Sequence, residues 1–423
     1  MSLVFSKLAE NYSGPVWDLK TLPNPLRSVT HLPRDLQLLF WSLFLWSFGL
    51  GLYNYIWPLF LQDLKADPSQ VGLVFSIGFL AAAATMFPGG ILANKYELKS
   101  LLIAGWALSI PPPLLYYFAG SWTDVIPGMI LFQVSAFNIP AFNAYIAGAT
   151  DKSRTGSSFG IVWASFPLGF VFSPAVGGAL LTWISIRDMF LLSFVLFTVS
   201  TIILFWMRPQ PPVKTNTRSF SLELPKSLSQ IVLLIFLAGT AIAFSIASPF
   251  VPLFFHDVLS LSPTSIQILG SVQSLGQTAF AFLLGGRADV RSRGRTMALG
   301  VIVSATGIAG IVLTRNLLLA FPLVFLLGSA RPSSYVAYSV LALIRSGASR
   351  AGEYGFYLTF ENLGFVVGSY IGGVLYLLNP VDGFVVTAVS FLVLALMVGL
   401  TNFRAKEPSD ASTTKLAGGL IAS

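Results

Sequence analysis

Two opposite charges stand inside stretches of the chain that are otherwise almost entirely apolar. Arg331 lies in the tenth long apolar stretch of the sequence, and Glu361 lies in the eleventh. A full charge at the centre of a bilayer costs at least about 2.5–3.5 kcal/mol, so we expect these two charges to pair. Glu361 is the only acidic residue deep in such a stretch. We therefore expect it to couple proton movement to function with Arg331 as its partner; the alternative is a static structural ion pair.

Uncharged polar side chains in the same stretches supply a candidate binding surface. Tyr335 and Tyr338 follow Arg331 by four and seven residues, so all three share one face of a helix. Gln273 and Gln277 share a face in the same way. The candidate substrate-binding residues are Tyr53, Asn54, Asn138, Asn143, Gln273, Gln277, Arg331, Tyr335, Tyr338, Tyr357 and Asn362. The alternative role for each is packing or hydrogen bonding between helices.

Membrane-spanning helices must position these side chains, because the composition fits no soluble class. Hydrophobic residues make up 55% of the 423 residues and charged residues only 10%, whereas soluble domains carry about 25% charged residues. Apolar stretches of about 20 residues recur, the length of a helix that crosses a hydrocarbon core. Long apolar runs also exclude a membrane β-barrel, whose strands alternate. We predict an all-α integral membrane protein with twelve transmembrane helices in two pseudo-symmetric six-helix bundles.

The distribution of basic residues predicts the topology of these helices. The predicted segments are an N-terminal tail (1–35), a bundle (36–207), a linker (208–228), a second bundle (229–403) and a C-terminal tail (404–423). Most of the 25 Lys and Arg residues fall in the tails, the linker and every second loop. The positive-inside rule then places both termini in the cytoplasm, with the protein in the plasma membrane. The net charge of +8 reflects this topology, and we expect no nucleic acid partner.

The two bundles are predicted to be copies of one pattern. Glycines in the fifth apolar stretch return 195 positions later in the eleventh, where small residues allow helices to approach closely. The residues expected to pack in this way are Gly169, Pro174, Gly177, Gly178, Gly364 and Gly368. By the same offset, Arg331 and Glu361 correspond to Ala136 and Phe166, so the duplicated fold requires neither charge.

The repeated pattern resembles the major facilitator superfamily over roughly residues 36–403. The run from Gly90 to Lys95 is similar to the loop motif of that family, except that Asn94 stands where the family has an acid. The second copy keeps the acid as Asp289. The resemblance implies a latch between the halves on the cytoplasmic side, formed by Gly90, Asn94, Lys95, Arg154, Gly285, Asp289, Arg293 and Arg350. The alternative is a basic loop that only sets topology.

The resemblance implies a secondary active transporter that works by alternating access. The glycines of the fifth stretch resemble the antiporter motif of the family, with Ser173 in place of one glycine, which points to proton-coupled export of a small organic solute. The alternative is close packing at the interface between the halves, which the repeat of these glycines in the second half favours. A proton symporter or uniporter for a sugar or organic anion stays open, and so does a non-transporting receptor. We expect no enzyme, cofactor or metal site, since the chain has no cysteine, only two histidines and no phosphate-binding loop. The expected partners are a small-molecule substrate, protons and membrane lipid, and we expect a monomer.

Overall fold

The computed structural model is helical wherever it forms regular structure. It describes residues 29–150, 155–212, 227–290, 292–314, 316–344, 350–401 and 403. Twelve helices or broken helices in these residues are long and apolar enough to cross a membrane. The predicted twelve-span, all-α architecture is therefore confirmed.

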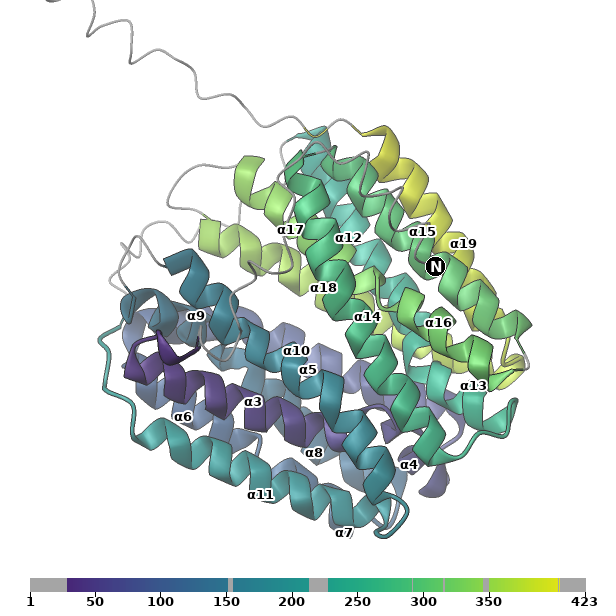
Figure 1. Cartoon of the computed structure of the whole chain (residues 1–423), viewed down its shortest axis with the longest axis horizontal. Helices are drawn as coiled ribbons and strands as arrows, with labels where there is room; N and C mark the ends of the chain where they lie inside the picture. Colours follow the sequence, from purple (N-terminus) through teal and green to yellow (C-terminus); the bar gives the residue numbers. More distant parts are fainter. Residues whose placement is uncertain are drawn as a thin grey trace, which may run out of the picture.

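The first six spans form one bundle, the N-half, which lies beside the second bundle, the C-half (Figure 1). The helices of the N-half are α3 (Arg34–Asn54), α4 (Trp57–Asp63), α5 (Pro68–Lys95), α6 (Leu98–Leu108), α7 (Pro111–Phe118), η1 (Trp122–Val125), α8 (Ile126–Val134), η2 (Ser135–Asn138), α9 (Ile139–Gly148), α10 (Thr155–Leu180) and α11 (Ile186–Phe205).

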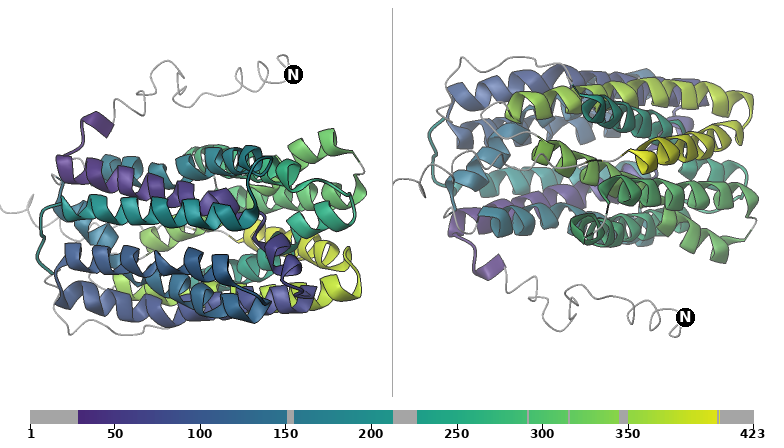
Figure 2. Two further views of the ribbon diagram at one scale, coloured as in Figure 1. Left: turned by 90° about the horizontal axis from the view of Figure 1, so that it is seen from below. Right: turned by 90° about the horizontal axis from the view of Figure 1, so that it is seen from above.

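The C-half contains the last six spans, and its helices run roughly alongside those of the N-half (Figure 2). They are α12 (Leu228–Ala247), η4 (Ser248–Phe250), α13 (Val251–Asp257), α14 (Pro263–Val290), α15 (Arg293–Leu313), α16 (Leu317–Leu327), α17 (Ala330–Ile344), α18 (Arg350–Leu378) and α19 (Asp382–Leu400).

Prolines break several spans near their middle. Proline has no backbone N–H and its ring clashes with the preceding turn, so it favours a kink or a break in a helix. Pro111 begins α7 after the third span turns at Ser109, and Pro140 lies in the first turn of α9, after the short η2 helix. Pro249 lies in η4, between α12 and α13. Broken helices place free backbone groups and side chains toward a central cavity in transport folds.

The two halves meet at the end of the molecule that carries α4 and α13, called here the α4/α13 end. There α5 packs against α18 and α10 packs against α14. Gly72 and Gly373 let α5 and α18 approach closely, because a Cβ on Gly373 would lie 3.0 Å from the Cα of Ser69. Ser76 Oγ donates to the Val366 carbonyl at 2.7 Å.

Polar contacts close the outer rim of the α4/α13 end. Gln62 Nε2 donates to Asp257 Oδ2 at 3.1 Å, and the Tyr376 hydroxyl donates to the same oxygen at 3.2 Å. His256 Nδ1 lies 2.9 Å from Asp257 Oδ1. Among the described residues, the hydrogen bonds that join the two halves all lie at this end. The opposite end, where the chain enters α3 and leaves α19, is called the terminal end.

Candidate functional site

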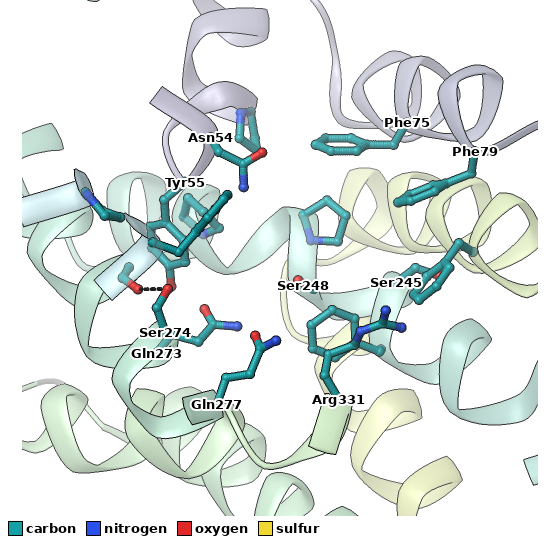
Figure 3. A pocket seen from close by; sticks show the side chains of 18 of the residues that line it. Asn54, Tyr55, Phe75, Phe79, Ser245, Ser248, Gln273, Ser274, Gln277 and Arg331 are labelled. Atoms are coloured by element: carbon teal, nitrogen blue, oxygen red, sulfur yellow. Dashed lines mark hydrogen bonds between the residues drawn. The ribbon is translucent and has the colours of Figure 1, made fainter. Parts of the chain in front are cut away.

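A cavity of about 370 Å³ lies between the halves, inside the closed α4/α13 end. Its size falls in the usual range for small-molecule sites. Figure 3 shows that Phe75 and Phe79 lie across the cavity from Gln277 and Arg331. Phe79 stacks on Phe365 of the C-half with ring centroids 4.9 Å apart, which bridges the two halves at the cavity wall.

The two walls of this cavity differ in chemistry. The N-half wall is mainly aromatic, with Asn54 and Tyr55 as its polar members. The C-half wall carries a charged guanidinium and many hydroxyls and amides. Its polar members are Ser245, Ser248, Gln273, Ser274, Gln277, Arg331 and Tyr335. The cavity is therefore amphipathic, with its polar groups concentrated on one half.

The ion pair suggested by the sequence is present in the C-half wall. Arg331 Nη1 donates to Glu361 Oε1 at 2.8 Å, and the Tyr338 hydroxyl donates to Glu361 Oε2 at 2.6 Å. Glu361 is 3% exposed, whereas the Arg331 side chain is 30% exposed and lines the cavity. The guanidinium also lies 5.1 Å from the centre of the Phe365 ring. The carboxylate is thus held inside the protein while its partner faces the cavity.

A break in the tenth span positions Arg331. α16 ends at Leu327, and Gly328 then packs directly against the backbone of α14, where a Cβ would leave no room. Ser329 Oγ donates to the Gly300 carbonyl at 2.7 Å and fixes the turn. α17 begins at Ala330, so the Arg331 side chain leaves its first turn next to α14 and α18.

The cavity collects part of the polar set selected from the sequence. Gln277 Nε2 donates to the Tyr335 hydroxyl at 3.3 Å, which joins α14 to α17. Asn54 lies at the end of α3, where the first span breaks before α4. The candidates that line the cavity are Asn54, Gln273, Gln277, Arg331 and Tyr335, and Tyr338 is connected to it through Glu361.

The other candidates lie away from this cavity. Tyr53 is buried in an aromatic cluster, 5.0 Å from the Phe190 ring. The Tyr357 hydroxyl donates to a backbone carbonyl of α12 at 3.3 Å, and Asn362 Nδ2 donates to a carbonyl of its own helix at 2.8 Å. Asn143 accepts a hydrogen bond inside the N-half. Asn138 lines a second cavity there.

Sequence reasoning missed the serines and phenylalanines of the cavity wall. Ser245, Ser248 and Ser274 belong to apolar stretches in which many serines bond to their own helix. Phe75 and Phe79 are two of 36 phenylalanines, and residue type alone does not separate a cavity wall from a lipid-facing surface. The spacing of Phe75 and Phe79 at four residues was the available signal, since it places both on one face.

The predicted latch residues that the structure describes lie at the terminal end, away from the contacts that close the α4/α13 end. Gly90, Asn94 and Lys95 belong to the last turns of α5, and Lys95 Nζ lies 5.4 Å from the Tyr96 ring. Gly285 lies in α14 with open space around it. Arg293 begins α15. Arg154 lies outside the described residues, and the side chains of Asp289 and Arg350 are not described.

The repeated glycines have two kinds of neighbour. Gly178 faces α14 of the other half, and Gly177 lies between Leu52 of α3 and Gln267 of α14. Gly169 packs against α3, and Gly364 and Gly368 pack against α12, within their own halves. Pro174 lies inside α10 and lines the central cavity. Two of the predicted packing residues thus belong to the interface between halves, and three belong to the bundles themselves.

The sequence profile described as Major Facilitator Superfamily matches residues 39–262 and 231–420. The chain belongs to this superfamily. It is therefore a transporter and a multi-pass integral membrane protein, not an enzyme.

Relatives of known sequence support this membership. The proton-coupled antiporter flippase LtaA of Staphylococcus aureus is 24% identical over 374 residues, which cover 84% of this chain and 92% of the relative. LtaA of Staphylococcus epidermidis is 23% identical over 88% of this chain and 97% of the relative. An uncharacterized MFS-type transporter of Methanocaldococcus jannaschii is 27% identical, over 35% of this chain and 39% of that protein.

Solved structures of the superfamily share the fold. A bacterial homolog of the human lysosomal transporter Spinster, in an inward-facing and occupied conformation, has a TM-score of 0.70 at 16% identity, covering 89% of this chain and 97% of that one. The nucleoside transporter NupG has a TM-score of 0.71 at 14% identity, covering 86% of this chain and 97% of that one.

Proposed function

We propose that this chain is a secondary active transporter that exchanges protons for a small amphipathic organic solute by alternating access. The observation that carries the proposal is Glu361, the one carboxylate among the buried side chains of the described residues. It is tied to the cavity through Arg331, which lines the cavity wall. An ionisable group in a membrane span that reaches a solute cavity is a natural site for proton coupling.

Competition within the C-half wall explains how protons and solute would be exchanged. With Glu361 ionised, the guanidinium of Arg331 is held against it and the amides of Gln273 and Gln277 are left for the solute. Protonation of Glu361 removes the charge that holds Arg331. The released guanidinium then turns toward the polar groups of the cavity and disfavours the solute. Proton and solute therefore bind in alternation, as antiport requires.

The amphipathic wall and the relatives support this form of transport. A solute with one polar and one apolar side would match the polar C-half wall and the aromatic N-half wall. The staphylococcal relatives carry the name proton-coupled antiporter flippase, and they align over most of both chains. The likeness of these relatives favours antiport over symport for this chain.

Alternating access requires a second state in which the α4/α13 end opens. Most of the basic residues that the structure describes lie at the terminal end, among them Lys95, Lys99 and Arg293. We therefore place that end in the cytoplasm of a cell with this protein in its plasma membrane. The closed α4/α13 end then faces outward, and the structure corresponds to an inward-facing state. In this state export begins when a solute enters from the cytoplasmic side.

The test starts with a compound that the protein binds. Sugars, amino acids, organic anions and lipophilic cations are screened for an increase in the thermal stability of the purified protein. Uptake of the compound that stabilises the protein is then measured in proteoliposomes that are acidic inside. Glu361→Gln should abolish accumulation driven by the pH gradient but leave exchange of labelled for unlabelled compound. Glu97→Gln, which changes an acid in the α5–α6 connection, is the matched control and should keep both.

The affinity of the Glu361→Gln variant decides between antiport and symport. Glutamine imitates the protonated acid, so antiport predicts weaker binding of the compound than in the wild type. Symport of an anion predicts tighter binding, because the released guanidinium would pair with it. Gradient-driven accumulation that persists in the variant would remove Glu361 from the mechanism.

A further inference from the structure

A second cavity of about 140 Å³ lies inside the N-half. It is enclosed by α3, α6, α8, η2, α9 and α10. Phe166 lines both this cavity and the central one, so its side chain borders both. We call this space the N-half pocket.

Aromatic rings fixed by hydrogen bonds form the walls of the N-half pocket. The indole N–H of Trp46 donates to Ser109 Oγ at 2.9 Å, and that of Trp163 donates to Asn143 Oδ1 at 3.0 Å. The Trp106 N–H donates to a serine hydroxyl of α11 at 2.9 Å. With their polar atoms bonded elsewhere, the indoles present ring surface to the pocket.

Two amides in the pocket make no hydrogen bond with any described residue. Asn138 is 6% exposed, and Gln133 lines the same space. The Asn138 amide packs over Gly105, and a Cβ on Gly105 would leave no room for that amide. A side-chain amide carries both donor and acceptor sites, so these two groups can bond to a molecule that enters the ring of aromatic side chains around them.

The duplication shows what this pocket corresponds to in the other half. Asn138 packs over Gly105 as Ser333 packs over Gly300, which fixes the register of the comparison. At the same register Ala136 and Phe166 take the places of Arg331 and Glu361. The C-half thus fills this position with its ion pair, whereas the N-half leaves an aromatic space.

We propose that the N-half pocket is a second subsite, which takes an aromatic ring that carries a hydrogen-bonding group on its edge. The inference rests on the proposed transport function, since the ring would be one end of the transported solute. The aromatic side chains that line the pocket supply apolar contact surface, and the amides of Gln133 and Asn138 bond to the ring edge. Displacement of Phe166 joins the pocket to the central cavity, where the polar end of the solute meets the C-half wall.

Two small probes test this assignment in lipid nanodiscs by titration calorimetry, with empty nanodiscs subtracted. 4-Ethylphenol has the edge hydroxyl, and ethylbenzene has the same shape without it. The wild type should bind 4-ethylphenol about tenfold more tightly, the equivalent of one hydrogen bond of about 1.4 kcal/mol. Asn138→Leu or Gln133→Leu should remove most of that preference while ethylbenzene still binds, which also shows that the pocket is intact.

A second pair of variants separates the two cavities. Ala136→Leu places a larger side chain in the pocket and should weaken both probes at least about tenfold. Gln277→Leu, in the central cavity, should change neither. The assignment is overturned if neither probe binds saturably, or if the preference for 4-ethylphenol survives in both amide variants. Binding of these probes needs no proton gradient, so loss of proton coupling and loss of the subsite are distinguishable.

Discussion

Removing the cation of the Arg331–Glu361 pair should destabilise the protein far more than removing both charges. Glu361 is 3% exposed and accepts from Arg331 Nη1 at 2.8 Å. Arg331→Met keeps a long side chain in the cavity wall but leaves the carboxylate buried with only the Tyr338 hydroxyl as a partner. Breaking a buried pair in this way costs about 3–5 kcal/mol.

Removing the acid of the pair, in place of the cation, should destabilise the protein less. Glu361→Gln leaves a neutral amide with one acceptor oxygen in place of two, and Arg331 keeps access to the cavity through its 30% exposed side chain. We expect a cost of about 1–2 kcal/mol, close to that of one buried hydrogen bond. The double variant Arg331→Met/Glu361→Gln contains no buried charge. Its free energy of unfolding should therefore lie within about 1 kcal/mol of that of Glu361→Gln alone.

Equilibrium unfolding of the purified variants in mixed detergent micelles measures these differences. A cost below about 1 kcal/mol for Arg331→Met, or a double variant whose cost equals the sum of the single ones, would refute the claim that the two charges compensate each other.

Two further predictions concern the α4/α13 end. Asp67→Ala removes the N-cap of α5 and should cost about 1 kcal/mol in the same unfolding assay. The Ser69 hydroxyl holds the pKa of Asp67 below its usual value of 3.8, so this contribution should be complete above pH 3.8 and be lost as the pH falls below it. Gly373→Val should push α18 away from α5, because a Cβ there already lies 3.0 Å from the Cα of Ser69. A cysteine introduced at Asn54 in this cysteine-free chain should then react faster with a reagent added on the α4/α13 side; an unchanged rate contradicts the role of the glycine in closure.

The spans could be predicted from sequence because each depends on a local property. Apolar length fixes where a helix crosses the membrane, and the offset of 195 residues shows that one bundle repeats the other. The breaks in the spans follow from prolines such as Pro111 and Pro140. The sequence does not show which end is closed, because contacts such as Ser76 with Val366 join residues 290 positions apart.

Site residues could be predicted only where burial of the side chain in a membrane costs so much free energy that the side chain needs a partner. Arg331 and Glu361 could be paired because each charge requires a partner in a membrane. Polar but uncharged residues carry no such constraint. Asn54 lines the central cavity while the neighbouring Tyr53 packs in an aromatic cluster, and a sequence does not reveal which of two adjacent residues faces inward.

The differences between two copies of one fold support the site proposed for this transporter. Both halves keep the glycines that pack α10 and α18, as two halves that move as rigid bodies in the proposed cycle would require. At one matching position they diverge, and the C-half holds Arg331 with Glu361 where the N-half holds Ala136 with Phe166. In the proposed exchange, a proton that binds Glu361 would change the charge of only one wall. The affinity of the C-half wall for the polar end of a solute would then change with each proton. The aromatic N-half wall would bind the apolar end throughout the cycle.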